Sequence, residues 1–161
     1  MIPVKLTPCE GCCCDLAPCR RTCQRMYVLS HTTPELITSL KPGEIFVFGS
    51  NEAGNHGRGA ALTAKQWGAK RSVSNGLSGQ TYAIPTKPAD VRRVLCLRDI
   101  SNYVNEFIKF AQNRPDLRFL VTSIGCGLAG YRPDDIAPLF TKCRGMGNVS
   151  LPKRFWEVLS K

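Results

Sequence analysis

Short runs of apolar, β-branched and aromatic residues recur along the chain after about residue 27. Residues 45–48 (IFVF) and 118–124 (RFLVTSI) are the densest runs, and both are typical of buried strands. Residues 81–85 predict a further strand, which we expect Pro85 to close. Residues 148–151 predict a last, short strand. Together these runs predict a sheet that contributes much of the core.

Amphipathic segments separate the strands. Across residues 97–112 the apolar side chains recur at steps of three and four, the spacing of one helix face. A shorter helix is expected over residues 59–67, stopped near Gly68, and another is expected to begin near Asp134 or Asp135. Strands that alternate with helices predict an α/β fold, with helices on both faces of a mixed, mostly parallel central sheet. In such sheets the ligand lies beyond the carboxyl ends of the strands.

The composition is that of a folded domain with excess positive charge. The chain has 161 residues, 43% of them hydrophobic, which suffices for one domain with a core, and we assign that domain to residues 27–161. The net charge of +10 favours an anionic partner or, alternatively, a solvated basic surface. No apolar run approaches the ~20 residues that span a membrane, and the first residues lack the apolar core of a signal peptide. We therefore expect a cytoplasmic protein with no membrane partner.

Residues 1–26 form a separate, cysteine-rich extension. Six of the nine cysteines fall within the first 23 residues, and a disulfide framework is not expected without an export signal. The cysteine spacing permits a structural zinc ion, while the alternative is a flexible tail with redox-sensitive thiols. No other cofactor is expected. The candidate metal ligands are Cys9, Cys12, Cys19 and Cys23.

A glycine-rich loop joins the strand at 45–48 to the helix that begins at Gly59. Its glycines let the backbone approach a ligand closely, and the unpaired amides at a helix start suit an anion. The alternative is a tight strand-to-helix link that binds nothing. The candidate ligand-binding residues of this first loop are Gly49, Ser50, Asn51, Gly54, Gly57, Arg58, Gly59 and Ala60.

A second glycine-rich loop also follows a predicted strand and precedes a predicted helix. Two such loops can hold the neighbouring phosphates of one diphosphate. Neither loop ends in the Gly-Lys-Ser/Thr of a P-loop, and residues 70–74 lack the acidic residue of the dinucleotide-binding fingerprint. The candidate ligand-binding residues of this second loop are Ser123, Ile124, Gly125, Cys126, Gly127, Leu128, Ala129, Gly130 and Tyr131.

The two loops carry a family resemblance. Residues 43–87, with FVFGSN and GRGAA, resemble macrodomain-like proteins of bacteria and phages. Residues 122–128 (TSIGCGL) resemble the phosphate loop of macrodomains that remove terminal ADP-ribose from proteins. The resemblance covers most of residues 43–152 and excludes the cysteine-rich extension. It implies a three-layer α/β/α sandwich that takes ADP-ribose across the top of the sheet.

The resemblance also implies how the ligand is held. Asn51 and the amides near residues 57–60 would face the distal ribose and a nearby phosphate, while residues 123–131 would wrap the diphosphate. Tyr131 would cover a ribose or, alternatively, serve as a half-exposed packing residue. Cys126 is a reactive thiol if nearby helix dipoles lower its pKa, and otherwise a small space-filling residue.

Two functional classes follow from the resemblance. The first is a module that reads or sequesters ADP-ribose or related nucleotides, including cyclic nucleotide signals. The second is a glycohydrolase or esterase that removes ADP-ribose from a protein, a nucleic acid or a small molecule. A weaker third reading is nucleic-acid binding through the basic surface, which predicts an affinity that falls steeply with salt.

Candidate catalytic residues are Lys87, His56 and Asp134. Lys87 matches the family's lysine nucleophile, although a surface lysine or a phosphate contact is the alternative. The assisting aspartate of that family is replaced here by Ala129. Asp134 and Asp135 fall where a helix begins, so capping is the more ordinary role. His56 in the first loop is expected to face solvent unless it acts on the ribose or phosphate.

Overall fold

The computed structural model describes residues 27–161. The cysteine-rich extension and the zinc ligands proposed within it lie outside the described residues. A single sheet runs through the described part, and its strand order is β1-β6-β5-β2-β4-β3. The strands are β1 (Thr32–Thr33), β2 (Glu44–Asn51), β3 (Gly76–Ser78), β4 (Thr81–Lys87), β5 (Arg118–Val121) and β6 (Val149–Pro152).

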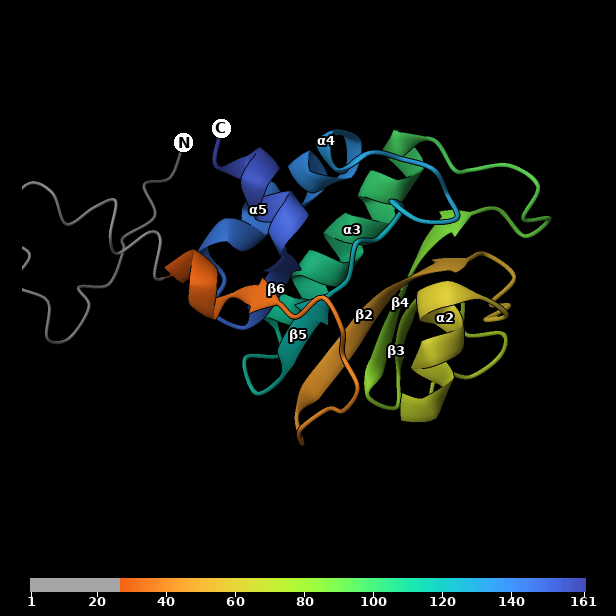
Figure 1. Cartoon of the computed structure of the whole chain (residues 1–161). Coiled ribbons are helices and arrows are strands. Elements are labelled where there is room, and N and C mark those ends of the chain that lie inside the picture. Colours follow the sequence, from red (N-terminus) through yellow and green to blue (C-terminus); the bar gives the residue numbers. More distant parts are fainter. Residues whose placement is uncertain (1–26) are drawn as a thin grey trace, which may run out of the picture.

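All neighbouring strands are parallel except β3, which pairs antiparallel with β4 at the edge of the sheet (Figure 1). The predicted α/β fold with a mixed, mostly parallel sheet is therefore confirmed. The helical segments are α2 (Gly59–Ala64), η1 (Lys65–Trp67), α3 (Leu97–Gln112), α4 (Pro133–Ile136), η2 (Ala137–Gly145) and α5 (Lys153–Leu159).

The structure contains helices at both segments predicted over 97–112 and 59–67. The amphipathic helix over 97–112 is α3 with the same bounds, and its buried face includes Ile100, Val104 and Phe107. The helix expected over 59–67 is divided into α2 and η1, and it ends at Gly68 with φ of 99°. A glycine there is required because this left-handed conformation is strained for other residues.

The prediction that Pro85 closes its strand was wrong. Strand β4 continues through Pro85 to Lys87, and Pro85 lies opposite Ser50 of β2. Strand β3 pairs with β4 only as far as Ala83, so the other side of β4 is unpaired at Pro85. A proline is tolerated where no partner strand needs its missing N–H group.

The prediction of a strand over 118–124 was also too long. Strand β5 ends at Val121, and the Ile124 amide turns back to donate to the Thr122 carbonyl at 2.7 Å. Ile124 is nevertheless buried. A buried loop residue is as apolar as a strand residue, and the apolar run in the sequence therefore predicted a strand longer than β5.

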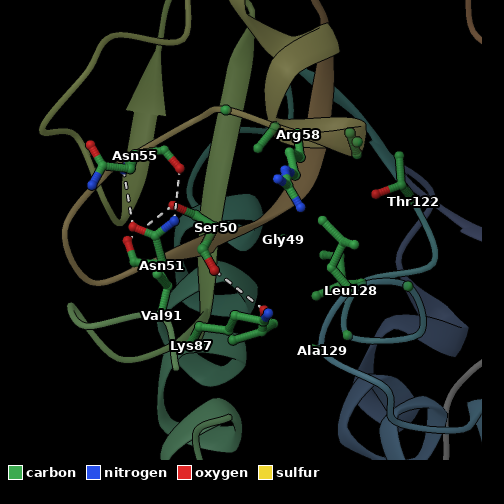
Figure 2. Close-up of a pocket in the computed structure, with 18 of the residues that line it drawn as sticks. Gly49, Ser50, Asn51, Asn55, Arg58, Lys87, Val91, Thr122, Leu128 and Ala129 are labelled. Carbon is green, nitrogen blue, oxygen red and sulfur yellow. Dashed lines mark hydrogen bonds between the residues drawn. The ribbon is translucent and has the colours of Figure 1, made fainter. Parts of the chain in front are cut away.

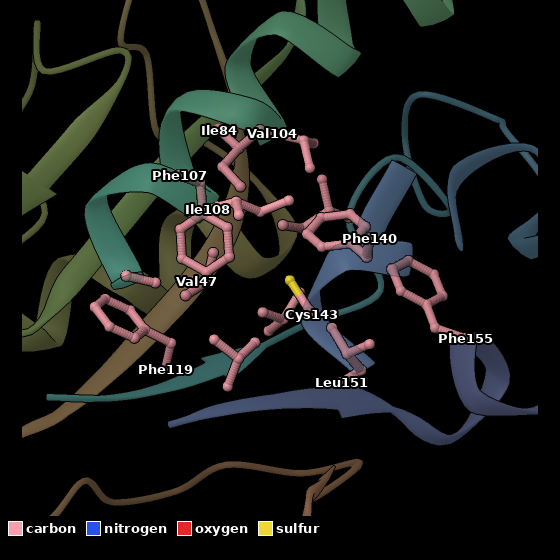
Figure 3. Close-up of a cluster of buried hydrophobic side chains, with 14 of the residues drawn as sticks. Val47, Ile84, Val104, Phe107, Ile108, Phe119, Phe140, Cys143, Leu151 and Phe155 are labelled. Atoms are coloured by element: carbon pink, nitrogen blue, oxygen red, sulfur yellow. The ribbon is translucent and has the colours of Figure 1, made fainter. Parts of the chain in front are cut away.

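The core lies on both faces of the sheet because alternate residues of β2 point in opposite directions. Ile45 and Val47 join the larger cluster, which α3, η2 and α5 cover, and Phe46 and Phe48 join a smaller cluster beneath α2. Figure 3 shows the larger cluster, in which the rings of Phe107, Phe119, Phe140 and Phe155 are fully buried.

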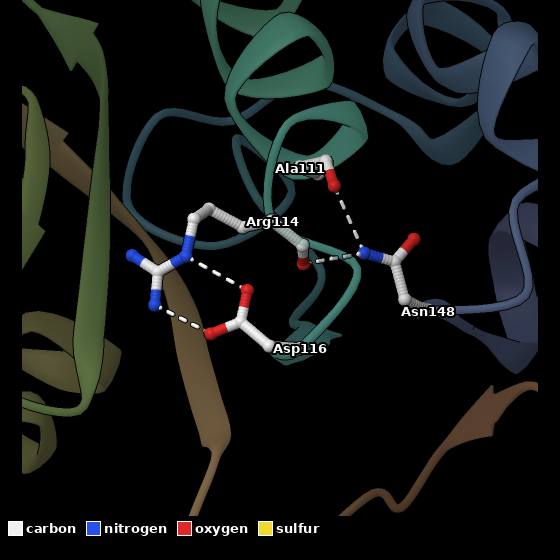
Figure 4. A network of polar contacts seen from close by, with 4 residues as sticks. All are labelled: Ala111, Arg114, Asp116 and Asn148. Carbon is white, nitrogen blue, oxygen red and sulfur yellow. Dashed lines mark hydrogen bonds and ion pairs between the residues drawn. The ribbon is translucent and has the colours of Figure 1, made fainter.

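The end of α3 is fixed by polar contacts (Figure 4). The Asn148 side-chain amide donates to the carbonyls of Ala111 and Arg114, at 2.9 and 3.1 Å, which satisfies acceptors that the helix leaves free. Arg114 also binds Asp116 through two hydrogen bonds, and these lower the pKa of that carboxyl. No helix in the described part of the chain is both long and apolar enough to traverse a membrane.

Candidate ligand-binding site

The two glycine-rich loops meet at one edge of the sheet. They leave the carboxyl ends of β2 and β5, which are neighbouring parallel strands. Between the loops lies a cavity of about 490 Å³, and the end of β4 contributes Thr86 and Lys87 to its wall. Figure 2 shows Asn51 and Asn55 of the first loop on one side, and Leu128 and Ala129 of the second loop on the other.

Most of the predicted ligand-binding residues line this cavity. Those that do so are Gly49, Ser50, Asn51, Gly57, Arg58, Gly59, Ala60, Ser123, Ile124, Gly125, Gly127, Leu128 and Ala129. The predicted residues outside the lining are Gly54, Cys126, Gly130 and Tyr131. Lining residues that the sequence reasoning missed are Asn55, Ala61, Thr86, Val91 and Thr122.

The first loop is closed by the side chain of Asn51. Its amide nitrogen donates to the Asn55 carbonyl at 2.7 Å, and its amide oxygen accepts from the Asn55 main-chain amide at 3.0 Å. Both polar ends of Asn51 are therefore used within the loop. This side chain therefore shapes the wall of the cavity where the resemblance implies the distal ribose.

The first loop also rests on the segment that follows η1. Gly54 has φ of 65°, and a Cβ atom there would lie 2.7 Å from the backbone of Ser72. The Ser72 amide donates to the Gly54 carbonyl at 3.2 Å. The glycine is required because this close backbone contact leaves no room for a side chain.

His56 is buried, so the expectation that it faces solvent was wrong. Only 3% of the residue is exposed, its ring packs edge-on against Phe48, and Nε2 lies 3.2 Å from the Lys70 carbonyl oxygen. Burial is the main cause of a lowered pKa for His56. The residue does not line the cavity, and its contacts make it a support for the first loop.

The second loop is shaped mainly by its own backbone. The amides of Cys126, Gly130 and Tyr131 donate to the carbonyls of Ser123, Gly127 and Gly125, at distances of 2.9–3.1 Å. The Tyr131 hydroxyl donates to the Leu95 carbonyl at 2.7 Å. Tyr131 therefore ties the loop to the segment after β4, a contact that fits its packing alternative, and it lies outside the lining of the cavity.

Cys126 is not an activated thiol. It is half-buried, and burial raises its pKa, although the charge of Arg154 acts in the opposite direction. A raised pKa leaves less of the nucleophilic thiolate at neutral pH. The residue also lies outside the lining, so its geometry fits the space-filling alternative.

Several main-chain amides at the cavity have no acceptor among the described residues. No hydrogen bond within residues 27–161 uses the amides of Gly57, Gly59 and Ala60 in the first loop. The same holds for Gly127 and Leu128 in the second loop. Free amides from consecutive loop residues form a surface that suits an anion such as a phosphate.

The charge of the lining is entirely positive. Among the described residues that line the cavity, Arg58 and Lys87 are ionisable, and none is Asp, Glu, His, Cys or Tyr. Glu52 is the carboxylate of the first loop, and it accepts a hydrogen bond from the Tyr103 hydroxyl on α3 at 2.9 Å. Burial and the contact with Glu52 raise the pKa of Tyr103 to about 12.

The structure does not bring Asp134 to the cavity. Its carboxylate forms an exposed ion pair with Lys161 at 3.4 Å. The neighbouring Asp135 accepts a hydrogen bond from the main-chain amide of Arg132 at 3.0 Å, which caps the start of α4. The capping role is therefore confirmed for Asp135 and not for Asp134.

Val91 is a strained residue in the cavity wall. Its φ is 52°, a conformation that is rare for a β-branched side chain, and 44% of the residue is exposed. Strain of this kind is stored where the surrounding structure holds the backbone in place, often at a functional site. Nothing in the local sequence predicts this conformation.

A second cavity of about 460 Å³ adjoins the first. The two share Ala60, Thr122 and Ser123 as walls. The second cavity lies at the carboxyl ends of β1 and β6, and it combines apolar residues such as Ile37 and Phe46 with polar ones. The two cavities are therefore neighbours at the carboxyl ends of the parallel strands.

Comparisons of the chain with protein-family models, curated proteins and solved structures found no match. A fold alone does not determine a function, whereas the residues of this site limit the ligands that it can bind.

Proposed function

We propose that this chain is a macrodomain-like, three-layer α/β/α module that binds ADP-ribose or a related ADP-ribose-derived nucleotide, as a reader or sequestering protein. The observation that carries the proposal is the convergence of both glycine-rich loops on one cavity with a positively charged lining. The helices on both faces of the sheet are consistent with the sandwich.

A diphosphate suits the first cavity. The free amides of both loops provide hydrogen-bond donors, and Arg58 and Lys87 provide two positive charges for the two phosphates. No carboxylate among the described lining residues of the first cavity repels the diphosphate. The distal ribose would lie near Asn51 and Lys87, at the ends of β2 and β4.

The nucleoside of the same ligand suits the second cavity. Leu36 and Ile37 provide apolar surface, and the shared wall at Thr122 and Ser123 would place the base directly beyond the diphosphate. Each cavity is within the size range of small-molecule sites, about 300–1,000 Å³. A two-part ligand accounts for both cavities with one binding mode.

Hydrolysis of ADP-ribosyl bonds is the second candidate, and the position of Lys87 in the cavity wall favours it. A lysine nucleophile also needs an acid–base partner to transfer protons. The described lining contains no such group, and Ala129 occupies the place where the related glycohydrolases have aspartate. These features favour binding over turnover.

The two functions are separated by incubating the full-length protein with ADP-ribosylated protein and with ADP-ribosylated nucleic acid. The binding function predicts retention of the modified substrate with no release of ADP-ribose. Release of free ADP-ribose that Lys87→Ala abolishes would instead establish the hydrolase. Unmodified protein and nucleic acid are the controls, because the basic surface alone binds anions in a salt-dependent way.

A further inference from the structure

The second cavity carries more positive charge than the nucleoside of ADP-ribose would use. Lys153 and Arg154, both exposed, stand side by side at the end of β6 and line this cavity. Neither forms an ion pair with any residue of the described range. Glu35 is the acidic residue of the lining, so the charge of the wall is net positive.

A buried polar group adds a second, independent observation. Thr33 is 3% exposed and lines the same cavity, and its hydroxyl oxygen has no hydrogen-bond partner within residues 27–161. A buried hydroxyl without a partner is costly, and this one belongs to a residue in the wall of the second cavity. An unpartnered polar group therefore lies in the same wall as the two cations.

The two cations of the first cavity are already paired with phosphates in the proposed complex. Arg58 and Lys87, with the free loop amides, match the two phosphates of ADP-ribose. The adenosine end of ADP-ribose is neutral at its ribose, so Lys153 and Arg154 would face no charge there. A ligand with a further anionic group at that end matches all four cations.

We propose that the preferred ligand carries a third phosphate, as a monoester on the ribose of its nucleoside, held by Lys153 and Arg154. This inference deepens the proposed function and rests on it, because it takes the second cavity as the place of the nucleoside. Arg154 suits this role, since it lines the same cavity as Thr122 and Ser123, which form part of the wall shared with the first cavity.

The test is calorimetric titration of the full-length protein with four ligands. These are ADP-ribose, ADP-ribose phosphorylated on the adenosine 2′-hydroxyl, adenosine 2′-phosphate and adenosine 3′-phosphate. The third phosphate is expected to strengthen the binding of ADP-ribose about tenfold at low salt, as a gain of about 1.4 kcal/mol would give. A comparison of the two adenosine monophosphates shows whether the site prefers a phosphate on the 2′-hydroxyl or on the 3′-hydroxyl of the ribose.

A charge-removing variant assigns the effect to its residues. In K153Q/R154Q, the affinity for 2′-phosphorylated ADP-ribose should be about equal to the affinity for ADP-ribose, so that the ratio of the two falls to about one. The control K109Q/R144Q removes the same charge from exposed positions outside both cavities, and it should keep the tenfold ratio. Circular dichroism and thermal unfolding would verify that each variant is folded.

The outcomes separate this inference from the proposed function. Binding of ADP-ribose without any gain from the third phosphate would overturn the inference and leave the proposed function intact. A gain that K153Q/R154Q retains, or that the control loses equally, would also overturn it. Failure of ADP-ribose to bind, with or without the additional phosphate, would overturn the proposed function.

Discussion

The two glycine-rich loops reach the same cavity but are held in different ways. The first loop is held by contacts with other parts of the chain, through Gly54 against Ser72 and through buried His56. The second loop is shaped by turns within itself, with Gly125 packed against Ile136, where an added Cβ would lie 3.0 Å away. In both loops other glycines face open space, namely Gly57 in the first and Gly127 in the second.

The difference shows that glycines in one motif serve two purposes. Gly54 and Gly125 have positive φ and a close neighbour, so they are required by the fold. Gly57 and Gly127 have neither constraint, yet both line the cavity. We infer that these open glycines leave room for a ligand, and the substitutions below separate the two groups.

Gly127→Glu should have the largest effect on binding. A Cβ atom at position 127 would have no neighbouring atom within 4 Å, so the loop should keep its conformation. The added carboxylate would then place a negative charge in the cavity. We expect the affinity for ADP-ribose to fall about 100-fold, or about 2.8 kcal/mol, by calorimetry. Gly147→Glu is the matched control, because Gly147 is equally open and lies outside the lining. An equal loss in both variants would contradict a local role for Gly127.

Gly54→Ala should have the largest effect on stability. The Cβ atom would lie 2.7 Å from the Ser72 backbone, at a φ of 65° that alanine disfavours. We expect the free energy of unfolding to fall by about 2 kcal/mol in urea denaturation. Gly57→Ala is the comparison, since nothing surrounds that position, and its stability should change by less than about 0.5 kcal/mol. Equal stability of the two variants would mean that Gly54 does not brace the loop.

Removing one positive charge from the cavity should weaken binding moderately. Arg58→Gln deletes an exposed cation of the lining without changing the backbone. A loss of about tenfold in affinity, or about 1.4 kcal/mol, is expected at low salt. The loss should shrink as salt is raised, because salt screens exposed charges. An affinity for ADP-ribose that is unchanged at every salt concentration would show that Arg58 does not face the phosphates.

Tyr131→Phe tests the tie between the second loop and the segment after β4. The variant loses only the hydrogen bond from the Tyr131 hydroxyl to the Leu95 carbonyl. We expect a loss of about 1 kcal/mol in the free energy of unfolding, with a smaller change in ligand affinity. A large loss of affinity without a loss of stability would support the alternative in which Tyr131 covers a ribose.

His56 should make the stability of the protein depend weakly on pH. Its folded-state pKa lies below the unfolded value of 6.5, so the unfolded chain binds the proton more readily. The free energy of unfolding should therefore fall as the pH drops below 6.5 toward the folded pKa. Urea denaturation of the wild type and of His56→Gln at pH 5 to 7.5 would measure the difference between their free energies of unfolding at each pH. A difference that does not change with pH would contradict burial of the neutral imidazole.

The sequence predicted those parts of the fold whose signal is local. The amphipathic period of α3 and the apolar run of β2 are strong patterns, and the glycines between strand and helix marked both loops. The parallel pairing followed from the alternation of strands and helices. These features depend on residues that are close in sequence, which explains why they were recovered.

The parts that were missed depend on contacts distant in sequence. The burial of His56 arises from the segment that carries Lys70, and the continuation of β4 past Pro85 depends on where β3 stops pairing. No local pattern encodes such contacts, so sequence reasoning placed the loops but not their supports. Val91 is a different case: its positive φ belongs to a local turn in which its amide donates to the Pro88 carbonyl at 3.1 Å, and a β-branched residue does not signal that conformation.

Amide chemical shifts would show whether both loops bind one ligand. Titration of ADP-ribose into the isotopically labelled full-length protein should move the amide signals of Gly57, Gly59 and Ala60 together with those of Gly127 and Leu128. We expect one dissociation constant to describe all of them, below about 1 mM. Shifts confined to one loop, different constants for the two loops, or no shifts up to that concentration would show that the loops do not share one ligand.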